Sequence, residues 1–529
     1  MMDKISHELD SMDSGDNRVN KRAKHVLEKI YKGIGNGLCS SFSGAGDVKA
    51  AYRLFDNEIV NPDTILMSHY EKTIERIRMH RVVGLVQDTT DIDMKHMKQV
   101  ENLGVINDAT RPGCTLHPIV AFTPEKLCLG VLDSKFITRS PEELGKKGSN
   151  NSRNIEDKES YRWIQGYQIA CKVAERCPET LCVCIGDRES DIYELFLEAQ
   201  NGRADFLIRA WHDRSVETPT SEENAKLIEE NDRLKEENRM LSATNERLRK
   251  HRNYKNKPDL IKERDENSTK IKRNRALIKE NQIVIGGDEL TTYRFKQQLQ
   301  NAPIIGELQF SLPERSENKS KTPRTPRTVS QVIRAKEVTL LPSRHKQDLP
   351  DVSVNAVFLQ EESPPAGEEP VIWMFLTSLP IATFEDIKQI INLYLSRWGI
   401  ELFFKILKSG CKIEELRFQE ASRLFACITL YMIVAWRILY STFIGRTCPE
   451  LACSALFEED EWRSLYAVVF QAKPPAVAPN LGEFMKWLAM LGGYRGRKSD
   501  GPPGMKAIWI GMQAMHRLAE GWRASREFG

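Results

Sequence analysis

The spacing of apolar residues predicts a small helical module followed by an α/β sheet. Between residues 17 and 80, apolar positions recur at helical intervals in three stretches separated by glycine- or proline-containing connections. Short apolar runs typical of strands come next, with an amphipathic helical stretch over 158–175 among them. These runs are VVGLVQD, LHPIVAFT, LCLGVLDSKF, TLCVCIGD and ADFLIRAW. The order strand, hairpin, helix, strand, helix, strand predicts an α/β fold with a mixed sheet.

A different pattern occupies residues 222–283, where Glu, Lys, Asn and Arg dominate. Leucines recur every seven residues, and an asparagine precedes each of them by three positions: Leu227, Leu234, Leu241 and Leu248, with Asn224, Asn231, Asn238 and Asn245. A second arm after Pro258 repeats the pattern with Asn267, Ile271, Asn274, Ile278 and Asn281. The heptads predict a helical hairpin whose arms pair antiparallel, with dimerisation through it as a second possibility. A solvated charged excursion is the alternative.

Strand-like alternation returns between residues 303 and 379. A basic loop interrupts it, because seven Lys or Arg and a single Glu lie between Arg315 and Lys336. Several cations on one flexible segment suit phosphate contact along a duplex, although a solvated linker would have the same composition. The remainder of the chain, 381–529, is expected to be helical apart from a glycine- and proline-rich break.

The bulk composition shows no polyelectrolyte character, so any nucleic-acid signal must be local. The 529 residues exceed the size of one hydrophobic core, and 77 basic against 74 acidic side chains leave a net charge of +3. Eleven cysteines without a CxxC pair suggest a reduced, cytoplasmic protein, nucleoid-associated if the source is bacterial. The start carries no apolar signal-peptide core; the longest uncharged run is 370–384, and the most helix-like one is 424–436, between Arg423 and Arg437. Both are too short to span a bilayer, so no membrane role is expected.

Two of the predicted buried strands end in aspartate, at Asp88 and Asp187. Carboxylates at strand ends of an α/β sheet commonly converge, and a cluster of such oxygens suits Mg²⁺ or Mn²⁺. A third acid would complete a cage for two metal ions. Strand-terminal aspartates alone are weak support for this hypothesis.

The segment YLSRWGIELFFKILKSGCKIEELR supplies a candidate third acid. Tyr394, Arg397, Glu401 and Lys408 lie at offsets of 0, 3, 7 and 14, which fall within about 60° of one face of a helix. Such a stripe would be about 21 Å long, so Glu401 could reach a metal while the two cations contact phosphates on either side. The alternative is a solvated face on which Arg397 and Glu401 form an ordinary i,i+4 pair.

The chain resembles insertion-sequence DDE transposases of the Tyr-Arg-Glu-Lys type, the group containing the transposase of the kanamycin-resistance composite transposon. The signature Y-x2-R-x3-E-x6-K is satisfied without a gap between residues 394 and 408. Further blocks occur in the expected order: QDTT at 87–90, GDRESDIYE at 186–194 and FLIRAWHDR at 206–214. Weaker similarities are GDNRVNKR at 15–22, AAYRLFDN at 50–57, WMFLTS at 373–378 and the glycine-rich segment near 492.

The resemblance implies a ribonuclease-H-like mixed sheet flanked by helices, in which Asp88, Asp187 and Glu401 hold two Mg²⁺ or Mn²⁺ ions. It also implies cut-and-paste transposition: cleavage at the transposon ends, a hairpin intermediate, and strand transfer to target DNA. Two alternatives remain at this point. One is a transposase-derived DNA-binding or regulatory protein that does not cut, and the other is a related metal-dependent nuclease.

The same resemblance assigns DNA contacts to residues outside the acids. Trp373 would receive a base that leaves the stack during hairpin formation. Tyr394, Arg397 and Lys408 would hold the distorted strand. Further phosphate or end-recognition candidates are Arg188, Arg209, Lys405, Arg417, Arg18, Arg22 and Arg53.

These interpretations combine into a predicted domain plan. It comprises an N-terminal end-recognition module (1–75), the first part of the catalytic domain (76–215), the charged hairpin (216–290), a β insertion with the basic loop (291–380), the second catalytic part (381–445) and a C-terminal helical region expected to mediate dimerisation (446–529). The expected partners are double-stranded DNA, as inverted-repeat ends and target, and a second copy of the chain on paired ends. The long separation between Asp187 and Glu401 and the short C-terminal tail depart from the pattern of the group.

Overall fold

The chain forms two compact units. A computed structural model describes residues 4–97, 100–107, 110–143, 154–216, 222–251, 257–285, 293–314, 325–343, 346, 348–497 and 499–528. Unit 1 comprises Met1–Trp211, Ile304–Ile333 and Asn355–Gly529, and unit 2 comprises His212–Pro303 and Arg334–Val354. This division splits the predicted β insertion, 291–380, between the units. Residues 315–324 of the basic loop lie outside the described residues.

Unit 1 begins with a 3-10 turn and helices, whose starts follow from their capping residues. These elements are η1 (Ile5–Leu9), α1 (Asn17–Lys32), α2 (Ala45–Phe55) and α3 (Pro62–Ile77). Asp16 caps α1 by accepting a hydrogen bond from the Arg18 N–H, and Asn61 caps α3 in the same way from Thr64. Pro62 occupies the first position of α3, where its missing N–H costs nothing.

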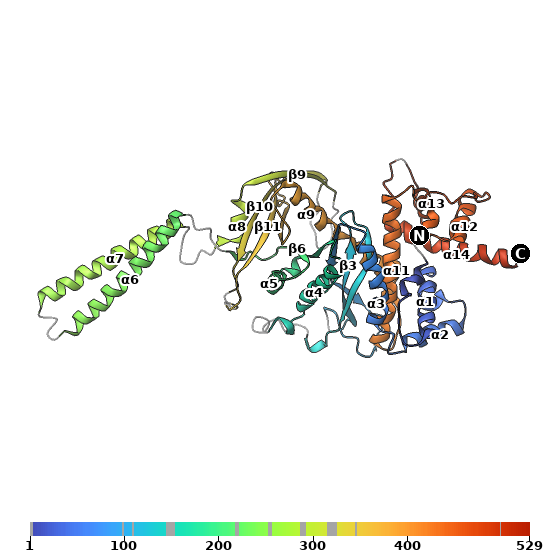
Figure 1. Cartoon of the computed structure of the whole chain (residues 1–529), viewed down its shortest axis with the longest axis horizontal. Helices are drawn as coiled ribbons and strands as arrows, with labels where there is room; N and C mark the ends of the chain where they lie inside the picture. Colours follow the sequence, from blue (N-terminus) through green and yellow to red (C-terminus); the bar gives the residue numbers. More distant parts are fainter. Residues whose placement is uncertain are drawn as a thin grey trace. The chain divides into compact units, whose positions relative to one another are not determined.

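The sheet of unit 1 is mixed, as the sequence predicted. Its central strands β1 (Val82–Gln87), β5 (Leu181–Gly186) and β6 (Asp205–Arg209) are parallel neighbours. On one side β3 (Gly113–Phe122) pairs antiparallel with β1, β2 (Thr90–Asp93) and β4 (Cys128–Ile137), and on the other side β12 (Ile372–Thr377) pairs antiparallel with β6. Helices α4 (Tyr161–Arg176) and α5 (Tyr193–Ala199) supply the connections around β5, with α4 packed on β5 and β1 (Figure 1). Every position of β3 is buried, so the sheet is the core of this unit.

The sheet continues beyond β12 in the order β12, β11, β10, with β9 paired to β10. These strands are β9 (Ile304–Leu312), β10 (Arg327–Leu340) and β11 (Val352–Glu361). Strands β10 and β11 belong to unit 1 at one end and to unit 2 at the other.

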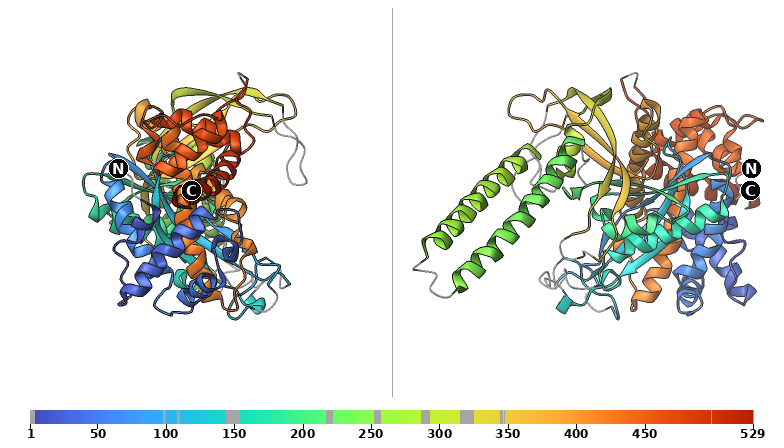
Figure 2. Two further views of the ribbon diagram at one scale, coloured as in Figure 1. Left: turned by 90° about the vertical axis from the view of Figure 1, so that its right-hand side faces the viewer. Right: turned by 60° about the vertical axis from the view of Figure 1, so that its left-hand side comes forward.

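The C-terminal part of unit 1 is helical. Its elements are α9 (Phe384–Ser396), α10 (Trp398–Lys405), the π-helical turn η8 (Ile406–Gly410), η9 (Ile413–Glu415), α11 (Ala421–Thr447), η10 (Cys453–Ala455), α12 (Glu459–Phe470), α13 (Leu481–Leu491) and α14 (Met505–Phe528). The capping box of Thr383 and Asp386 fixes the start of α9. Of these helices, α11 and α14 pack against the N-terminal ones, as the views in Figure 2 show.

Helix α11 is longer than the apolar stretch 424–436, from which the sequence predicts a segment too short to span a bilayer. The helix has 27 residues and is long and apolar enough to cross a membrane, yet 89% of its apolar window is buried inside the fold. The flanking arginines do not end it, because Arg437 lies within the helix, is buried, and donates to the Leu456 carbonyl at 2.8 Å. The helix therefore serves as a core element of unit 1.

Unit 2 contains the asparagine-rich hairpin. Helices α6 (Glu222–Lys250) and α7 (Pro258–Ile285) lie side by side and run antiparallel (Figures 1 and 2). Asn281 donates to Asn231 at 3.1 Å, and Asn267 donates to Asn245 at 3.2 Å. Between these layers Leu234 and Ile271 are buried, so apolar contacts alternate with amide pairs along the seam. The unit also contains β7 (Ser215–Val216), β8 (Tyr293–Arg294) and α8 (Phe295–Gln300).

Candidate active site

Asp88 and Asp187 leave two neighbouring parallel strands at the same edge of the sheet. Val86 on β1 is in register with Ile185 on β5, so the residues that follow these strands are brought together. Each carboxylate is fixed by a backbone N–H just beyond it. Thr89 N–H donates to Asp88 Oδ1 at 2.8 Å, and Glu189 N–H donates to Asp187 Oδ1 at 2.9 Å. The two acids therefore have one oriented oxygen each and one oxygen left for another partner.

Glu401 reaches this edge from α10, and Arg397 joins it to Asp88. The guanidinium donates through Nη1 to Asp88 Oδ2 and through Nη2 to Glu401 Oε1, both at 2.8 Å. The Arg397 side chain is largely buried, whereas that of Glu401 is 56% exposed. One arginine thus bridges carboxylates that belong to opposite ends of the catalytic region.

The electrostatics place Asp187 within the same cluster. Burial raises the pKa of Asp88 to about 6; the charge of Arg397 lowers it, while the charges of Asp187 and Glu401 raise it further. Burial lowers the pKa of Arg397, but the neighbouring Tyr394, Asp88 and Glu401 outweigh burial and raise it above its ordinary value. The ion pair is therefore a charged one, held in a partly dry environment.

The donor set fits a hard divalent cation, although the acids are not preassembled around one. Carboxylate oxygens at strand ends are the ligands that Mg²⁺ and Mn²⁺ prefer. Among the described residues, no three His, Cys, Asp or Glu side chains are gathered closely enough to hold a metal. Instead, the Arg397 guanidinium lies between Asp88 and Glu401. Cation binding would require Arg397 to leave its carboxylate partners.

The predicted exposed stripe on one continuous helix is wrong. Helix α9 ends at Ser396, Arg397 lies in the turn between helices, and the helical turn from Ile406 is a π turn in which Cys411 N–H donates to the Ile406 carbonyl. Tyr394 is buried, with its ring 4.5 Å from that of Phe375. Arg397, Glu401 and Lys408 remain at least partly accessible, and Lys408 lies 3.9 Å from Glu414.

The other cations predicted to contact DNA differ in their burial and in their neighbours. Arg209 has a lowered pKa because it is buried, and the charges of Arg188 and Arg397 lower it further while Tyr394 raises it. Arg188 lies over the indole of Trp211, 4.6 Å from its centroid. Lys405 and Arg417 are exposed. Arg209 therefore lies close enough to Arg397 for their charges to interact, whereas Lys405 and Arg417 are surface cations.

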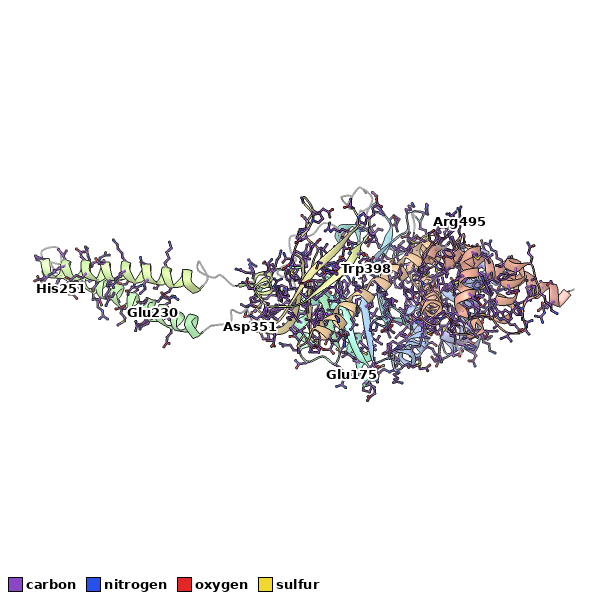
Figure 3. All side chains as sticks on the ribbon, turned by 90° about the horizontal axis from the view of Figure 1, so that it is seen from above. Glu175, Glu230, His251, Asp351, Trp398 and Arg495 are labelled. Carbon is purple, nitrogen blue, oxygen red and sulfur yellow. The ribbon has the colours of Figure 1, made fainter. Side chains whose placement is uncertain are left out.

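Trp373 is half-buried on β12. Its ring stacks on Phe310 at 6.0 Å and contacts Phe375 at 6.1 Å edge-on. Two tryptophans that were not predicted to contact DNA are more exposed, Trp211 at 58% and Trp398 at 57%. Trp398 is labelled in Figure 3. Both stand inside the blocks quoted above, but their exposure depends on packing that sequence spacing does not reveal.

The N-terminal arginines are surface residues. Arg18 pairs with Asp16 at 3.1 Å, Arg22 pairs with Asp47 at 3.0 Å, and Arg53 is exposed. Two of the three cations are therefore already paired with carboxylates within the helical module.

Comparison with known proteins defines the class. The family model described as "Transposase DDE domain" matches residues 164–436, more than half of the chain. Models described as "Transposase DNA-binding" and "Transposase Tn5 dimerisation domain" match residues 1–60 and 433–529. The chain belongs to the DDE transposase family and is a DDE transposase. The assignment carries a ribonuclease-H-like fold, a dependence on divalent metal, DNA as partner and a capacity to dimerise.

One solved structure found by the comparison is the cryo-EM structure of the piggyBac transposase synaptic complex with hairpin DNA. It is 7% identical, with a TM-score of 0.34, over 97% of this chain and 73% of that one. A likeness at this level supports no conclusion about this chain.

Proposed function

We propose that this chain is a cut-and-paste transposase of the Tyr-Arg-Glu-Lys type, whose Asp88, Asp187 and Glu401 together hold two Mg²⁺ or Mn²⁺ ions. The observation that supports it best is the cluster itself: two acids at adjacent strand ends, joined to a helical glutamate through Arg397. When bound, such ions lower the pKa of an attacking water or 3′-hydroxyl and stabilise the leaving oxygen.

The protein residues prepare this chemistry by orientation and charge. The backbone N–H groups of Thr89 and Glu189 each hold one carboxylate oxygen of Asp88 and Asp187, and Arg397 holds the other oxygen of Asp88. Arg397 turns from the carboxylates to a phosphate when cation and DNA enter. Its fork-shaped guanidinium suits that phosphate as well as it suits the two acids.

The proposal extends to the other residues expected to contact DNA. Lys408, Lys405 and Arg417 contact phosphates of the transposon end, and Arg188 and Arg209 contact the strand beside the acids. The Arg397 guanidinium lies over the ring of Tyr394, which is buried and so helps to position the arginine. Trp373 receives a displaced base after its partner Phe310 shifts, and the N-terminal module reads the end through Arg18, Arg22 and Arg53.

Cleavage proceeds through a hairpin on the transposon end, followed by strand transfer to target DNA. Two chains hold the paired ends, using the C-terminal helices as their interface. In a bacterial host the enzyme acts on the nucleoid in the cytoplasm.

A labelled linear duplex carrying the inverted repeats that flank the gene, incubated with the protein and Mg²⁺, tests the proposal. Hairpin-ended or excised products are expected. Asp88→Asn, Asp187→Asn and Glu401→Gln should each lower cleavage by at least about 10³-fold, since each removes a cation ligand. The matched control is Asp93→Asn, which removes a carboxylate of β2 that is paired with Arg111.

Other outcomes contradict the proposal in distinct ways. Nicks without hairpins or joined products indicate a metal-dependent nuclease. Retarded but uncut DNA indicates a binding protein. Full cleavage by any of the three acid variants would show that the replaced acid is not a required cation ligand, and the assigned site would be refuted.

A further inference from the structure

Five polar side chains form a continuous chain of hydrogen bonds that links the segments next to Asp88 and Asp187. In order they are Glu189, Arg162, Thr89, His117 and Gln87. The first follows β5, the second begins α4, the third follows β1, the fourth lies on β3 and the last ends β1. The chain therefore connects most of the elements that surround the two acids.

Three of the four links are hydrogen bonds of ordinary length, and the bond from Arg162 to Thr89 is slightly longer. Arg162 Nη2 donates to Glu189 Oε2 at 2.8 Å, and Arg162 Nε donates to Thr89 Oγ1 at 3.3 Å. Thr89 Oγ1 lies 2.9 Å from His117 Nδ1, and His117 Nε2 lies 3.0 Å from Gln87 Oε1.

The two ends of the chain determine the direction of every bond in it. At one end Gln87 Nε2 donates to the Trp163 carbonyl at 3.3 Å, and a carbonyl can only accept. Gln87 therefore presents its oxygen to His117, which must donate from Nε2 and accept at Nδ1. At the other end Arg162 can only donate, so the Thr89 hydroxyl accepts from it. Because burial lowers the pKa of His117 and keeps the ring neutral, Nδ1 carries no proton once Nε2 donates to Gln87, and the Thr89 hydroxyl donates to Nδ1. His117 is consequently the neutral Nε2–H tautomer.

Packing holds this arrangement in place. Gln87 and His117 are each 1% exposed, and burial lowers the pKa of His117 far below its ordinary value, with Arg162 and Lys135 lowering it further. The His117 ring contacts the Trp163 ring edge-on at 4.7 Å. A Cβ at Gly166 on α4 would lie 2.0 Å from Gln87 Oε1, so the helix can approach this amide only because that residue is glycine.

The chain ends on the two turns that carry the acids. Gln87 and Thr89 flank Asp88, and the N–H of Thr89 holds one Asp88 oxygen. Glu189 lies two residues after Asp187, and its N–H holds one Asp187 oxygen. A shift of either turn would stretch the Arg162 bonds that join them.

We propose that Arg162, Thr89 and His117 are positioning residues that keep the Asp88 and Asp187 turns at the separation needed to share a divalent cation. This inference rests on the proposed function, which assigns both aspartates as cation ligands. Groups that orient ligands in this way commonly change metal affinity by about 10-fold to 100-fold when they are removed.

Thr89 offers a matched pair of variants. Thr89→Val keeps the side-chain shape but leaves Arg162 Nε and His117 Nδ1 without the hydroxyl that joins them, whereas Thr89→Ser keeps the hydroxyl. Mn²⁺ binding to the full chain without DNA is measured by isothermal titration calorimetry and by the paramagnetic resonance signal of free Mn²⁺. We expect Thr89→Val to weaken binding by about tenfold or more, and Thr89→Ser to restore affinity to within about threefold of the unmodified chain.

Glu189→Ala cuts the chain at its exposed end: the Glu189 side chain is 61% exposed, and Arg162 keeps its hydrogen bond to the Glu159 carbonyl. The folded fraction of this variant is measured beside its Mn²⁺ affinity. The variant should weaken Mn²⁺ binding in the same direction. In cleavage assays both variants should need more Mn²⁺ for half-maximal rate while recovering rate at saturating Mn²⁺. A purely structural role would lower the folded fraction without moving that midpoint.

Two results distinguish failure of the positioning role from failure of the proposed cation ligands. If Asp88→Asn abolishes Mn²⁺ binding while Thr89→Val and Glu189→Ala bind like the unmodified chain, the positioning role is refuted and the proposed function stands. If Asp88→Asn binds Mn²⁺ normally, the ligand assignment itself fails, and the positioning role fails with it.

Discussion

Arg397 lies where a divalent cation would neutralise Asp88 and Glu401. Because its guanidinium competes with the cation for these carboxylates, removing it should favour metal binding to the free protein. We expect Arg397→Gln to tighten Mn²⁺ binding without DNA by on the order of tenfold, equivalent to ~1.4 kcal/mol, and to slow DNA cleavage because a phosphate contact is lost. Calorimetric titration and a cleavage assay check the two effects separately.

The control for this variant is Arg176→Gln, which breaks an arginine–glutamate pair with Glu71 outside the acid cluster. It should leave Mn²⁺ affinity unchanged. Equal or weaker Mn²⁺ binding by Arg397→Gln would show that the guanidinium does not compete with the cation.

The raised pKa of Asp88 predicts a pH-dependent stability. Its pKa rises from the ordinary 3.8 to about 6 in the folded chain, so the folded state binds this proton more tightly than the unfolded state. The resulting penalty is absent below pH 3.8, grows as pH rises, and is complete above about pH 6. The shift corresponds to at most about 3 kcal/mol. Asp88→Asn should therefore be more stable than the unmodified chain at pH 8 without metal.

Urea unfolding in the presence of a chelator at pH 4.5, 6 and 8 measures this difference. Asp93→Asn is again the control, because its carboxylate is paired at the surface and its pKa is lowered, chiefly by the hydrogen bond from Arg111. A stability gain for Asp88→Asn that does not grow between pH 4.5 and pH 8 would refute the assignment.

At the residue scale, the sequence predicted those parts of the site that depend on strand ends. Asp88 and Asp187 could be paired because parallel neighbours align their carboxyl ends. The Arg397–Glu401 pair was one of the two interpretations of the spacing, whereas the bond from Arg397 to Asp88 could not be predicted because the two residues are 309 positions apart in sequence. The chain through His117 was also missed, because its members come from separate elements and no short motif joins them.

At the scale of elements, a buried ionic network attaches the N-terminal turn to the catalytic part of unit 1. Glu8 of η1 accepts from both Nη atoms of Arg76 at 2.9 and 3.1 Å, and lies 2.6 Å from His69 Nδ1. Val131 N–H on β4 donates to His69 Nε2, so His69 carries its proton on Nδ1 and donates it to Glu8. Arg76 also lies over the Trp436 ring of α11.

Breaking this network should destabilise the protein strongly. Glu8→Gln leaves the buried Arg76 without its carboxylate, and we expect a loss of about 3 kcal/mol in the free energy of unfolding at pH 7. Asp10→Asn, which removes the partner of Lys24 at the surface, is the control and should cost less than about 1 kcal/mol. Urea or guanidinium unfolding distinguishes them.

The pH dependence of this effect has a definite sign. Burial alone would raise the pKa of Glu8, but His69 and Arg76 outweigh it and lower the pKa to about 2. The stabilisation is therefore complete above the ordinary value of 4.5 and is lost as pH falls toward 2. The difference between Glu8→Gln and the unmodified chain should shrink over that interval. A constant difference would mean that the charge of Glu8 is not responsible.

Elements were easier to predict from sequence than their ends. The mixed sheet followed from the order of apolar runs. The extent of α11 did not, because Arg423 and Arg437 were taken as its limits, whereas buried Arg437 finds a carbonyl partner that only the folded structure provides.

At the scale of the whole molecule, the acids belong to unit 1 and the asparagine-rich hairpin to unit 2. Replacing residues 222–285 with a short glycine–serine linker should therefore leave Mn²⁺ affinity within about twofold, because helices α6 and α7 pack along their own seam. The control is Leu234→Asp with Ile271→Asp, which disrupts the seam without shortening the chain. Loss of Mn²⁺ binding in the deletion variant would mean that the hairpin supports the site.

Strand β12 and helix α10 come late in a unit whose first strands are made hundreds of residues earlier. During synthesis, the ribosome therefore releases the aspartate-bearing strands long before the glutamate that completes the cluster. A nascent or prematurely terminated chain that ends before residue 401 carries residues 1–60, which match the transposase DNA-binding model, but lacks Glu401. If Glu401 is a cation ligand as proposed, such fragments would bind DNA without cutting it, so incomplete translation products would act as inhibitors of the full-length enzyme.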